Sequence, residues 1–104
     1  MKEHGKLVEN LVFIHLMRLN KEIFYWQGKN EVDFIIKDDE NSLTALNVTY
    51  SDEIKDRDLN GLIEFKEKFR SKVKDLILLT KNTEKTNKGI AYIPVWKWVL
   101  LEKR

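Results

Sequence analysis

The sequence predicts an α/β domain in which a mixed sheet is flanked by helices. Segments with the apolar period of a helix alternate with short segments that have the composition of strands. Polar connections separate most of these segments, and their order along the chain is αβββαββα. Neither a repeat nor a linker divides the 104 residues, so residues 1–104 are expected to fold as one domain.

Three segments are predicted to be helices. Residues 5–19 are apolar around most of the helical circumference, which predicts a mostly buried helix. Residues 55–72 are amphipathic, with Asp56 and Asp58 near the start and basic residues near the end, as the helix dipole favours. Residues 96–101 follow Pro94 and predict a short terminal helix.

Five segments are predicted to be strands: residues 23–27, 31–37, 44–50, 75–80 and 89–95. Short polar connections join the first three, which predicts an antiparallel meander. The fourth is an apolar run that follows the second helix, so we expect a buried strand reached by a crossover connection. The polar residues 81–88 predict a loop before the last strand.

Composition narrows the class of protein. With 42% hydrophobic and 35% charged residues, the chain has the composition of a folded protein and not of a disordered one. It has no cysteine, which excludes disulfides, a thiol nucleophile and cysteine-ligated zinc. A net charge of +2 is too balanced to indicate nucleic-acid binding by itself. No signal-peptide pattern or membrane-spanning run is present, which predicts a cytoplasmic protein without a membrane partner.

Asp33 is the most unusual residue, because a carboxylate within an apolar strand is costly unless it is paired, hydrogen-bonded or bound to a metal. On the next strand Asn47 and Thr49 share a face, so they are expected beside Asp33 if the two strands pair. A structural salt bridge between Asp33 and Lys55 or Arg57 is the alternative explanation. Strand alternation predicts two faces for the Asp33 strand, one with Glu31, Asp33 and Ile35 and the other with Val32, Phe34 and Ile36.

These segments resemble the PD-(D/E)xK nuclease-like domains at the C-terminus of prokaryotic AAA-type ATPases. The resemblance covers nearly the whole chain and rests on three segments: a first helix with Glu9, the strand Glu31-Val32-Asp33-Phe34, and the strand Leu46-Asn47-Val48-Thr49-Tyr50-Ser51. It implies a restriction-endonuclease-like fold, and it implies that residues 1–104 are the C-terminal part of a larger ATPase.

In that family an acidic residue on the first helix, an aspartate on the second strand and a (D/E)xK motif on the third bind Mg²⁺ and orient a water for phosphodiester cleavage. The resemblance assigns Glu9, Asp33, Asn47 and Thr49 to the catalytic positions, and it assigns Glu9, Asp33 and the Val48 carbonyl to the metal. Asn47 offers a neutral oxygen where a carboxylate is expected, and Thr49 lacks the positive charge of the lysine. The implied Mg²⁺ site is therefore weak or absent.

The first hypothesis for function is thus a nuclease-related accessory domain that associates with nucleic acid, with degenerate or absent cleavage. Its partners would be DNA and an ATPase domain in the same or another chain. Lys66, Arg70 and Lys72 belong to the densest positive stretch and are the expected contacts to nucleic acid, although a solvated helix face is the alternative for these residues. An active Mg²⁺-dependent DNA endonuclease with Glu9 and Asp33 as ligands is another hypothesis.

A hypothesis of a different class is a protein interaction module. It would dock on an ATPase or form a homo-oligomer through the region of Tyr92, Trp96 and Trp98. An exposed apolar patch in this region would favour the interaction module, whereas a basic rim around Glu9 and Asp33 would favour nucleic acid.

Overall fold

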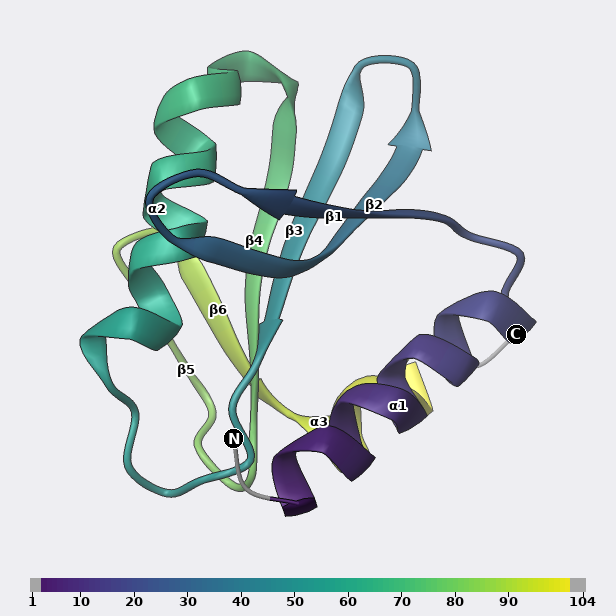
Figure 1. Ribbon diagram of the computed structural model, residues 1–104, viewed down its shortest axis with the longest axis vertical. Coiled ribbons are helices and arrows are strands. Elements are labelled where there is room, and N and C mark those ends of the chain that lie inside the picture. The colour runs from purple at the N-terminus through teal and green to yellow at the C-terminus, as the bar shows by residue number, and fades with distance from the viewer. Residues whose placement is uncertain (1–2, 102–104) are drawn as a thin grey trace.

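A computed structural model of the protein describes residues 3–101, and the fold is a six-stranded mixed sheet with helices on both faces (Figure 1). The elements are α1 (Glu3–Arg18), β1 (Glu22–Gln27), β2 (Glu31–Asp39), β3 (Ser42–Val48), α2 (Asp56–Phe69), the 3-10 turn η1 (Arg70–Lys72), β4 (Val73–Thr80), β5 (Lys85–Asn87), β6 (Ile90–Pro94) and α3 (Val95–Leu101). This architecture confirms the predicted α/β class.

The strands lie in the order β1-β2-β3-β4-β6-β5. β1, β2 and β3 pair antiparallel, which confirms the predicted meander. α2 then crosses over to β4, which pairs parallel with β3, and β6 pairs parallel with β4. None of the helices in residues 3–101 is long and apolar enough to cross a membrane.

The predicted loop at residues 81–88 contains a strand, which corrects the predicted order. β5 pairs antiparallel with β6, and the pair Asn87 and Ile90 closes a hairpin. The turn residues Lys88 and Gly89 have φ angles of 52° and 79°. Positive φ at both central residues is characteristic of a type I′ hairpin turn. All three β5 residues are exposed, so their sequence carries no apolar alternation from which a strand is predicted.

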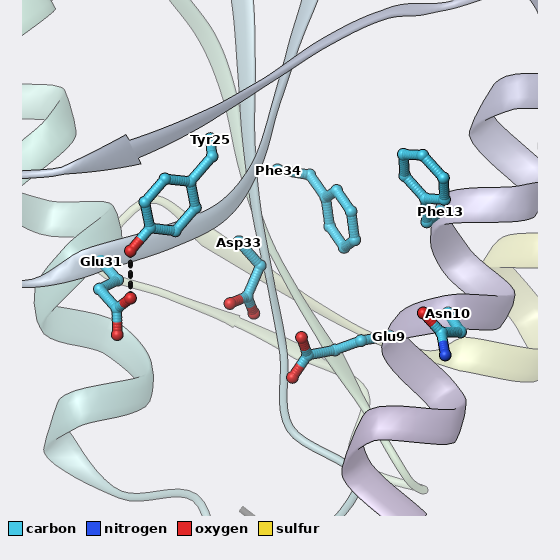
Figure 2. A pocket seen from close by; sticks show the side chains of 7 residues that line it. All are labelled: Glu9, Asn10, Phe13, Tyr25, Glu31, Asp33 and Phe34. Atoms are coloured by element: carbon cyan, nitrogen blue, oxygen red, sulfur yellow. Dashed lines mark hydrogen bonds between the residues drawn. The ribbon is translucent and has the colours of Figure 1, made fainter.

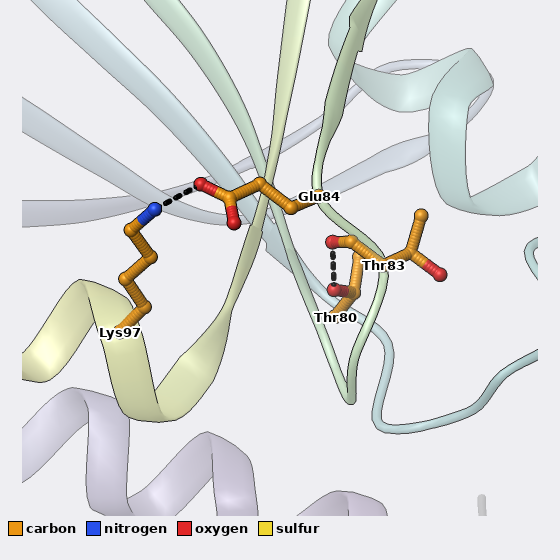
Figure 3. Close-up of polar contacts among 4 residues, drawn as sticks. All are labelled: Thr80, Thr83, Glu84 and Lys97. Carbon is orange, nitrogen blue, oxygen red and sulfur yellow. Dashed lines mark hydrogen bonds and ion pairs between the residues drawn. The ribbon is translucent and has the colours of Figure 1, made fainter.

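The core consists of two clusters, one on each face of the sheet. Beneath α2 the buried residues include Val32, Ile35, Leu62, Phe65 and Leu78. Beneath α1 and α3 they are Val8, Val12, Leu16, Phe34, Ile36, Leu46, Leu79 and Trp98. Polar contacts also hold α3 and the β4–β5 connection in place (Figure 3). Lys97 pairs with Glu84 at the surface, and the hydroxyl of the buried Thr80 donates to the Thr83 carbonyl at 2.6 Å.

The prediction that α1 is mostly buried is wrong. Val8, Val12 and Leu16 form its buried stripe, and they follow one another at four-residue spacing. The large apolar side chains on the rest of the helix are 45% to 61% exposed: Leu7, Leu11, Phe13, Ile14 and Met17. Apolar periodicity indicates which faces of a helix are apolar, but it does not indicate what covers them.

The prediction of simple alternation along β2 is also wrong, because β2 contains a bulge. β1 pairs Trp26 with Val32 but Phe24 with Ile35, so Tyr25 lies opposite both Asp33 and Phe34. The extra residue reverses the faces on either side of it. Val32 therefore joins Ile35 beneath α2, whereas sequence alternation placed Val32 and Ile35 on opposite faces.

Candidate functional site

The candidate site begins where β2 and β3 separate. Their backbone ladder ends at the pair Phe34 and Leu46. Beyond this pair, side chains join the strands: the Asp33 amide donates to Asn47 Oδ1 at 2.7 Å, and the Val48 amide donates to Asp33 Oδ2 at 2.9 Å. Each strand thus satisfies a backbone amide of the other with a side-chain oxygen, which places Asp33 and Asn47 together as the sequence predicts.

Asn47 has a structural role where β2 and β3 separate beyond the pair Phe34 and Leu46, a place termed the fork. Its side chain is 6% exposed, and its amide nitrogen donates to the Glu31 carbonyl at 3.3 Å and to the Asp58 carbonyl at 3.2 Å. Together with the bond from Asp33, these contacts use both amide hydrogens and the side-chain oxygen. The side chain therefore links β2, β3 and α2.

Two further residues hold α2 against the start of β2 and the turn that precedes it. A Cβ atom at Gly61 would lie 1.9 Å from the Glu31 carbonyl oxygen, so this close approach requires glycine. Glu64 accepts hydrogen bonds from the amides of Lys29 and Asn30, both at 2.9 Å, and these amides lower the pKa of Glu64. The β1–β2 turn is thereby fixed to α2.

Glu9 projects from α1 toward Asp33, and Tyr25 donates a hydrogen bond to Glu31 in the same pocket (Figure 2). Burial raises the pKa of Asp33, against the opposing effect of the Val48 amide, and the charges of Glu31 and Asp58 raise it further. Burial also raises the pKa of Glu9, and the Asp33 carboxylate adds to this increase. Glu9 Oε2 is buried without a hydrogen-bond partner in the described part of the chain.

The alternative explanation for Asp33, a salt bridge with Lys55 or Arg57, is wrong. Within residues 3–101 the ion pair that forms is Lys97 with Glu84, which involves neither Asp33 nor its two candidate partners. Asp33 is instead satisfied by the Val48 amide.

A wide groove of about 1160 Å³ opens beside the fork, and Asp33, Asn47, Val48 and Thr49 all line it. Glu9 lines an adjoining pocket of about 380 Å³, and Glu31 and Asp33 contribute to both hollows. The structure therefore brings together all the residues that the family resemblance assigns to catalysis and to the metal.

The predicted nucleic-acid contacts lie elsewhere. Lys66 is exposed near the end of α2, and Arg70 and Lys72 are exposed on η1. The groove instead meets the start of α2, so Lys66 lies roughly 13 Å along the helix from Arg57, by the rise of an α-helix.

The basic residues that line the groove are Lys29, Lys55, Arg57 and Lys81. The sequence singled out Lys81 within the positive stretch and named Lys55 and Arg57 only as partners of Asp33, and it missed Lys29. A signal was present for Lys81, because it follows β4, and parallel strands bring their carboxyl ends to one edge of a sheet. Thr49 follows β3 at this same edge.

The donor set does not fit the Mg²⁺ site that the resemblance implies. Mg²⁺ takes near-octahedral oxygen ligands, with one or more carboxylates among them. In the part of the chain that the structure describes, no group of three or more His, Cys, Asp or Glu side chains is arranged to hold a metal ion. Asn47 Oδ1 already accepts the Asp33 amide, so Glu9 and Asp33 are left without the third acidic ligand of the motif.

Comparison with known proteins places the chain in a family. Residues 4–98 match the family described as a domain of unknown function, DUF4143. The chain is also 30% identical to the uncharacterized protein MJ1544 of Methanocaldococcus jannaschii, over 112 aligned positions that cover 95% of this chain and 25% of the relative. It therefore spans about a quarter of that relative's length. No solved structure matched significantly. From the match over most of its length, the chain belongs to the DUF4143 family.

Proposed function

We propose that the protein is a nuclease-related accessory domain that binds nucleic acid without cleaving it and acts with an ATPase in the same or another chain. The observation that carries the proposal is the position of Asn47. It stands where the PD-(D/E)xK motif has an acidic ligand, and three hydrogen bonds commit its side chain to the fold. A cytoplasmic location is part of this proposal.

The relationship to PD-(D/E)xK nucleases is supported by the arrangement of the motif positions. Glu9 on α1, Asp33 on β2, and Asn47 and Thr49 at the end of β3 line two adjoining hollows. A nuclease motif requires these positions to converge, and here they converge from three elements that are separate in sequence.

The absence of cleavage follows from the chemistry of the same positions. Cleavage of a phosphodiester needs neutralised charge on the phosphate and a nucleophile generated from water. Thr49 carries no charge, and Asn47 is neutral and already bonded. Burial raises the pKa of both Glu9 and Asp33, and the charge of Lys6 lowers the pKa of Glu9 too little to reverse this increase.

Binding to nucleic acid is supported by the four cations of the groove, which are Lys29, Lys55, Arg57 and Lys81. All four are exposed and can reach phosphates. Tyr50 also lines the groove, is 42% exposed, and offers an aromatic surface on which a base can stack. The groove is also lined by carboxylates, which outnumber these cations, so the proposal predicts weak binding that falls as salt rises. They are Glu31, Asp33, Asp52, Glu53 and Asp58.

The test is binding of fluorescently labelled single-stranded, duplex and junction DNA, and of RNA, measured by anisotropy at low salt. The groove variant Lys55→Glu/Arg57→Glu is compared with Lys66→Glu/Arg70→Glu, which changes the net charge equally at the other end of α2. We expect the groove variant to lose about tenfold or more in affinity and the control to lose about threefold or less, because only the groove variant removes contacts to phosphate.

Two outcomes would contradict this proposal. No binding by the wild type at about 100 µM, the weak limit of non-specific association, would remove nucleic acid as the partner. A larger loss in Lys66→Glu/Arg70→Glu would move the binding surface to the end of α2 and away from the groove.

A further inference from the structure

The outer surface of α1 is apolar and uncovered. At 100° per residue, its exposed apolar side chains lie opposite the buried stripe, with the exposed Asn10 among them. These side chains are Leu7 (60% exposed), Leu11 (61%), Phe13 (46%), Ile14 (45%) and Met17 (53%), and together they are termed the α1 apolar face. Within residues 5–18 the single carboxylate, Glu9, points inward, so the face carries Lys6 and Arg18 near its ends and no acidic residue.

α3 adds exposed apolar side chains on the same side of the sheet, and these together with the α1 apolar face are termed the layer. α3 lies on the same side of the sheet as α1 (Figure 1), and the rings of His15 and Trp98 meet edge to face at a centroid distance of 5.3 Å. On its outer surface Trp96, Leu100 and Leu101 are 60% to 64% exposed. The interaction region predicted from sequence is therefore divided: Trp96 is exposed, whereas Tyr92 and Trp98 are each 3% exposed and belong to the core.

The size of the layer indicates what it can bind. Monomeric soluble proteins rarely expose contiguous apolar patches of more than a few hundred Å², and larger patches mark interaction sites. At roughly 100 Å² for each of the eight exposed side chains, the layer presents about 800 Å², which is the area that one partner buries in a standard stable interface. A second copy of this chain presents the same layer, so a two-fold symmetric contact matches this area on both partners.

We propose that α1 and α3 pack against the same two helices of a second copy of this chain, in a two-fold symmetric dimer. A crossing of the two α1 helices near Leu11 and Ile14 would bury the α1 apolar face at the centre. Lys6 and Arg18 are separated by roughly 18 Å of helix, so such a crossing leaves both in solvent at the rim. The like charges of the two copies then do not oppose the dimer.

This inference goes beyond the proposed function and is separate from it. Leu11 and Ile14 line neither the groove nor the pocket of Glu9. Variants at these positions therefore test the dimer alone, and nucleic-acid binding by the same variants reports independently on the groove.

The first test is sedimentation of the full chain over a range of protein concentrations, with Leu11→Lys and Ile14→Lys compared with Phe24→Lys. Phe24 is a matched control, because it is 48% exposed and shares the α2 side of the sheet with Trp26. We expect a wild-type dimer, at least a tenfold weaker dimer for each α1 variant, and a change within about twofold for the control. Circular dichroism verifies that all variants fold.

A wild type that stays monomeric would overturn the dimer and leave an acidic partner protein as the occupant of this face. A dimer that Phe24→Lys disrupts, or that both α1 variants retain, would overturn it as well.

Cross-linking provides a second test that does not weaken the interface. The chain has no cysteine, so any disulfide-linked dimer must form through the single cysteine that is introduced. Under oxidation, Ile14→Cys should form a covalent dimer near the two-fold axis, whereas Phe24→Cys should stay monomeric on a non-reducing gel. Equal cross-linking of both variants would show random collision and contradict the proposed dimer.

Discussion

α1 and α2 cover opposite faces of one sheet, and the chain attaches them by different means. α2 buries Leu62 and Phe65 almost completely, and polar contacts to Glu64 and Asn47 hold it in addition. α1 is held mainly by one apolar stripe and exposes the rest of its apolar surface. The α2 side therefore forms a fixed groove, whereas the α1 side leaves a broad apolar surface exposed, on which the proposed dimer depends.

The largest expected contrast compares the same substitution on the two helices. Leu62→Ala leaves a cavity beneath α2 at a fully buried position and should cost about 3 kcal/mol of stability. Leu11→Ala changes an exposed position on α1 and should change the free energy of unfolding of the monomer by about 0.5 kcal/mol or less. Urea denaturation at low protein concentration measures both, and similar losses would refute the contrast between the faces.

The next largest effect on stability is expected at Gly61, where α2 and β2 are in close contact. Gly61→Ala places a Cβ atom against the Glu31 carbonyl and should cost roughly 3 kcal/mol, because backbone atoms must move. The control is Gly89→Ala, where no atom lies within 4 Å of the added Cβ but the φ angle is 79°. This variant should lose about 1 kcal/mol from backbone strain alone. Equal losses in chemical denaturation would show that α2 can shift away from β2.

The hydrogen bonds of Asn47 should contribute slightly less to folding stability than the close contact at Gly61. Asn47→Ala leaves the Asp33 amide and the Glu31 and Asp58 carbonyls without their partner, at a cost of about 2 kcal/mol. Asn47→Asp should also destabilise the fold, since a carboxylate cannot donate to the two carbonyls. Asn10→Ala is an exposed control that should change stability by about 0.5 kcal/mol or less. A fully stable Asn47→Asp variant would show that this position is free to hold a ligand.

The smallest effect concerns Glu9 and depends on pH. Because the folded-state pKa of Glu9 is raised above 4.5, the native state binds more protons, and its stability falls as pH rises through the folded pKa. Glu9→Gln should therefore be more stable than the wild type at pH 7, by about 1 kcal/mol or less after solvent screening. The gain should disappear below pH 4.5, where the carboxyl is protonated in both states.

Thermal unfolding at several pH values measures this difference, and the exposed Glu67→Gln is the control on α2. If Glu9→Gln stays more stable than the wild type at acidic pH, the gain comes from packing and not from removal of the charge.

Most of the fold was predictable because it depends on local pattern. The helix and strand periods, the short polar connections of β1 to β3 and the crossover through α2 all have direct sequence signals. The bulge opposite Tyr25 was not predictable, since one added residue in a strand leaves composition unchanged. The exposure of α1 depends on which elements pack around it, and periodicity carries no information on this.

The candidate site was predictable only in part. The convergence of Glu9, Asp33, Asn47 and Thr49 follows from the resemblance and from strand pairing. The bond from Asn47 to the Asp58 carbonyl joins residues eleven positions apart in different elements, and no spacing rule predicts it. The groove cations come from three separate loops and helix ends, so they do not form a positive run in the sequence.

The most direct test of the central claim is a single assay of plasmid binding and nicking in the presence of Mg²⁺ or Mn²⁺, with the wild type and Asp33→Asn in parallel. The fork geometry predicts that both proteins retard the plasmid and that neither nicks it, because Asn47 and Thr49 cannot complete the catalytic chemistry. Metal-dependent nicking by the wild type that is lost in Asp33→Asn would contradict the account and establish the protein as an active nuclease.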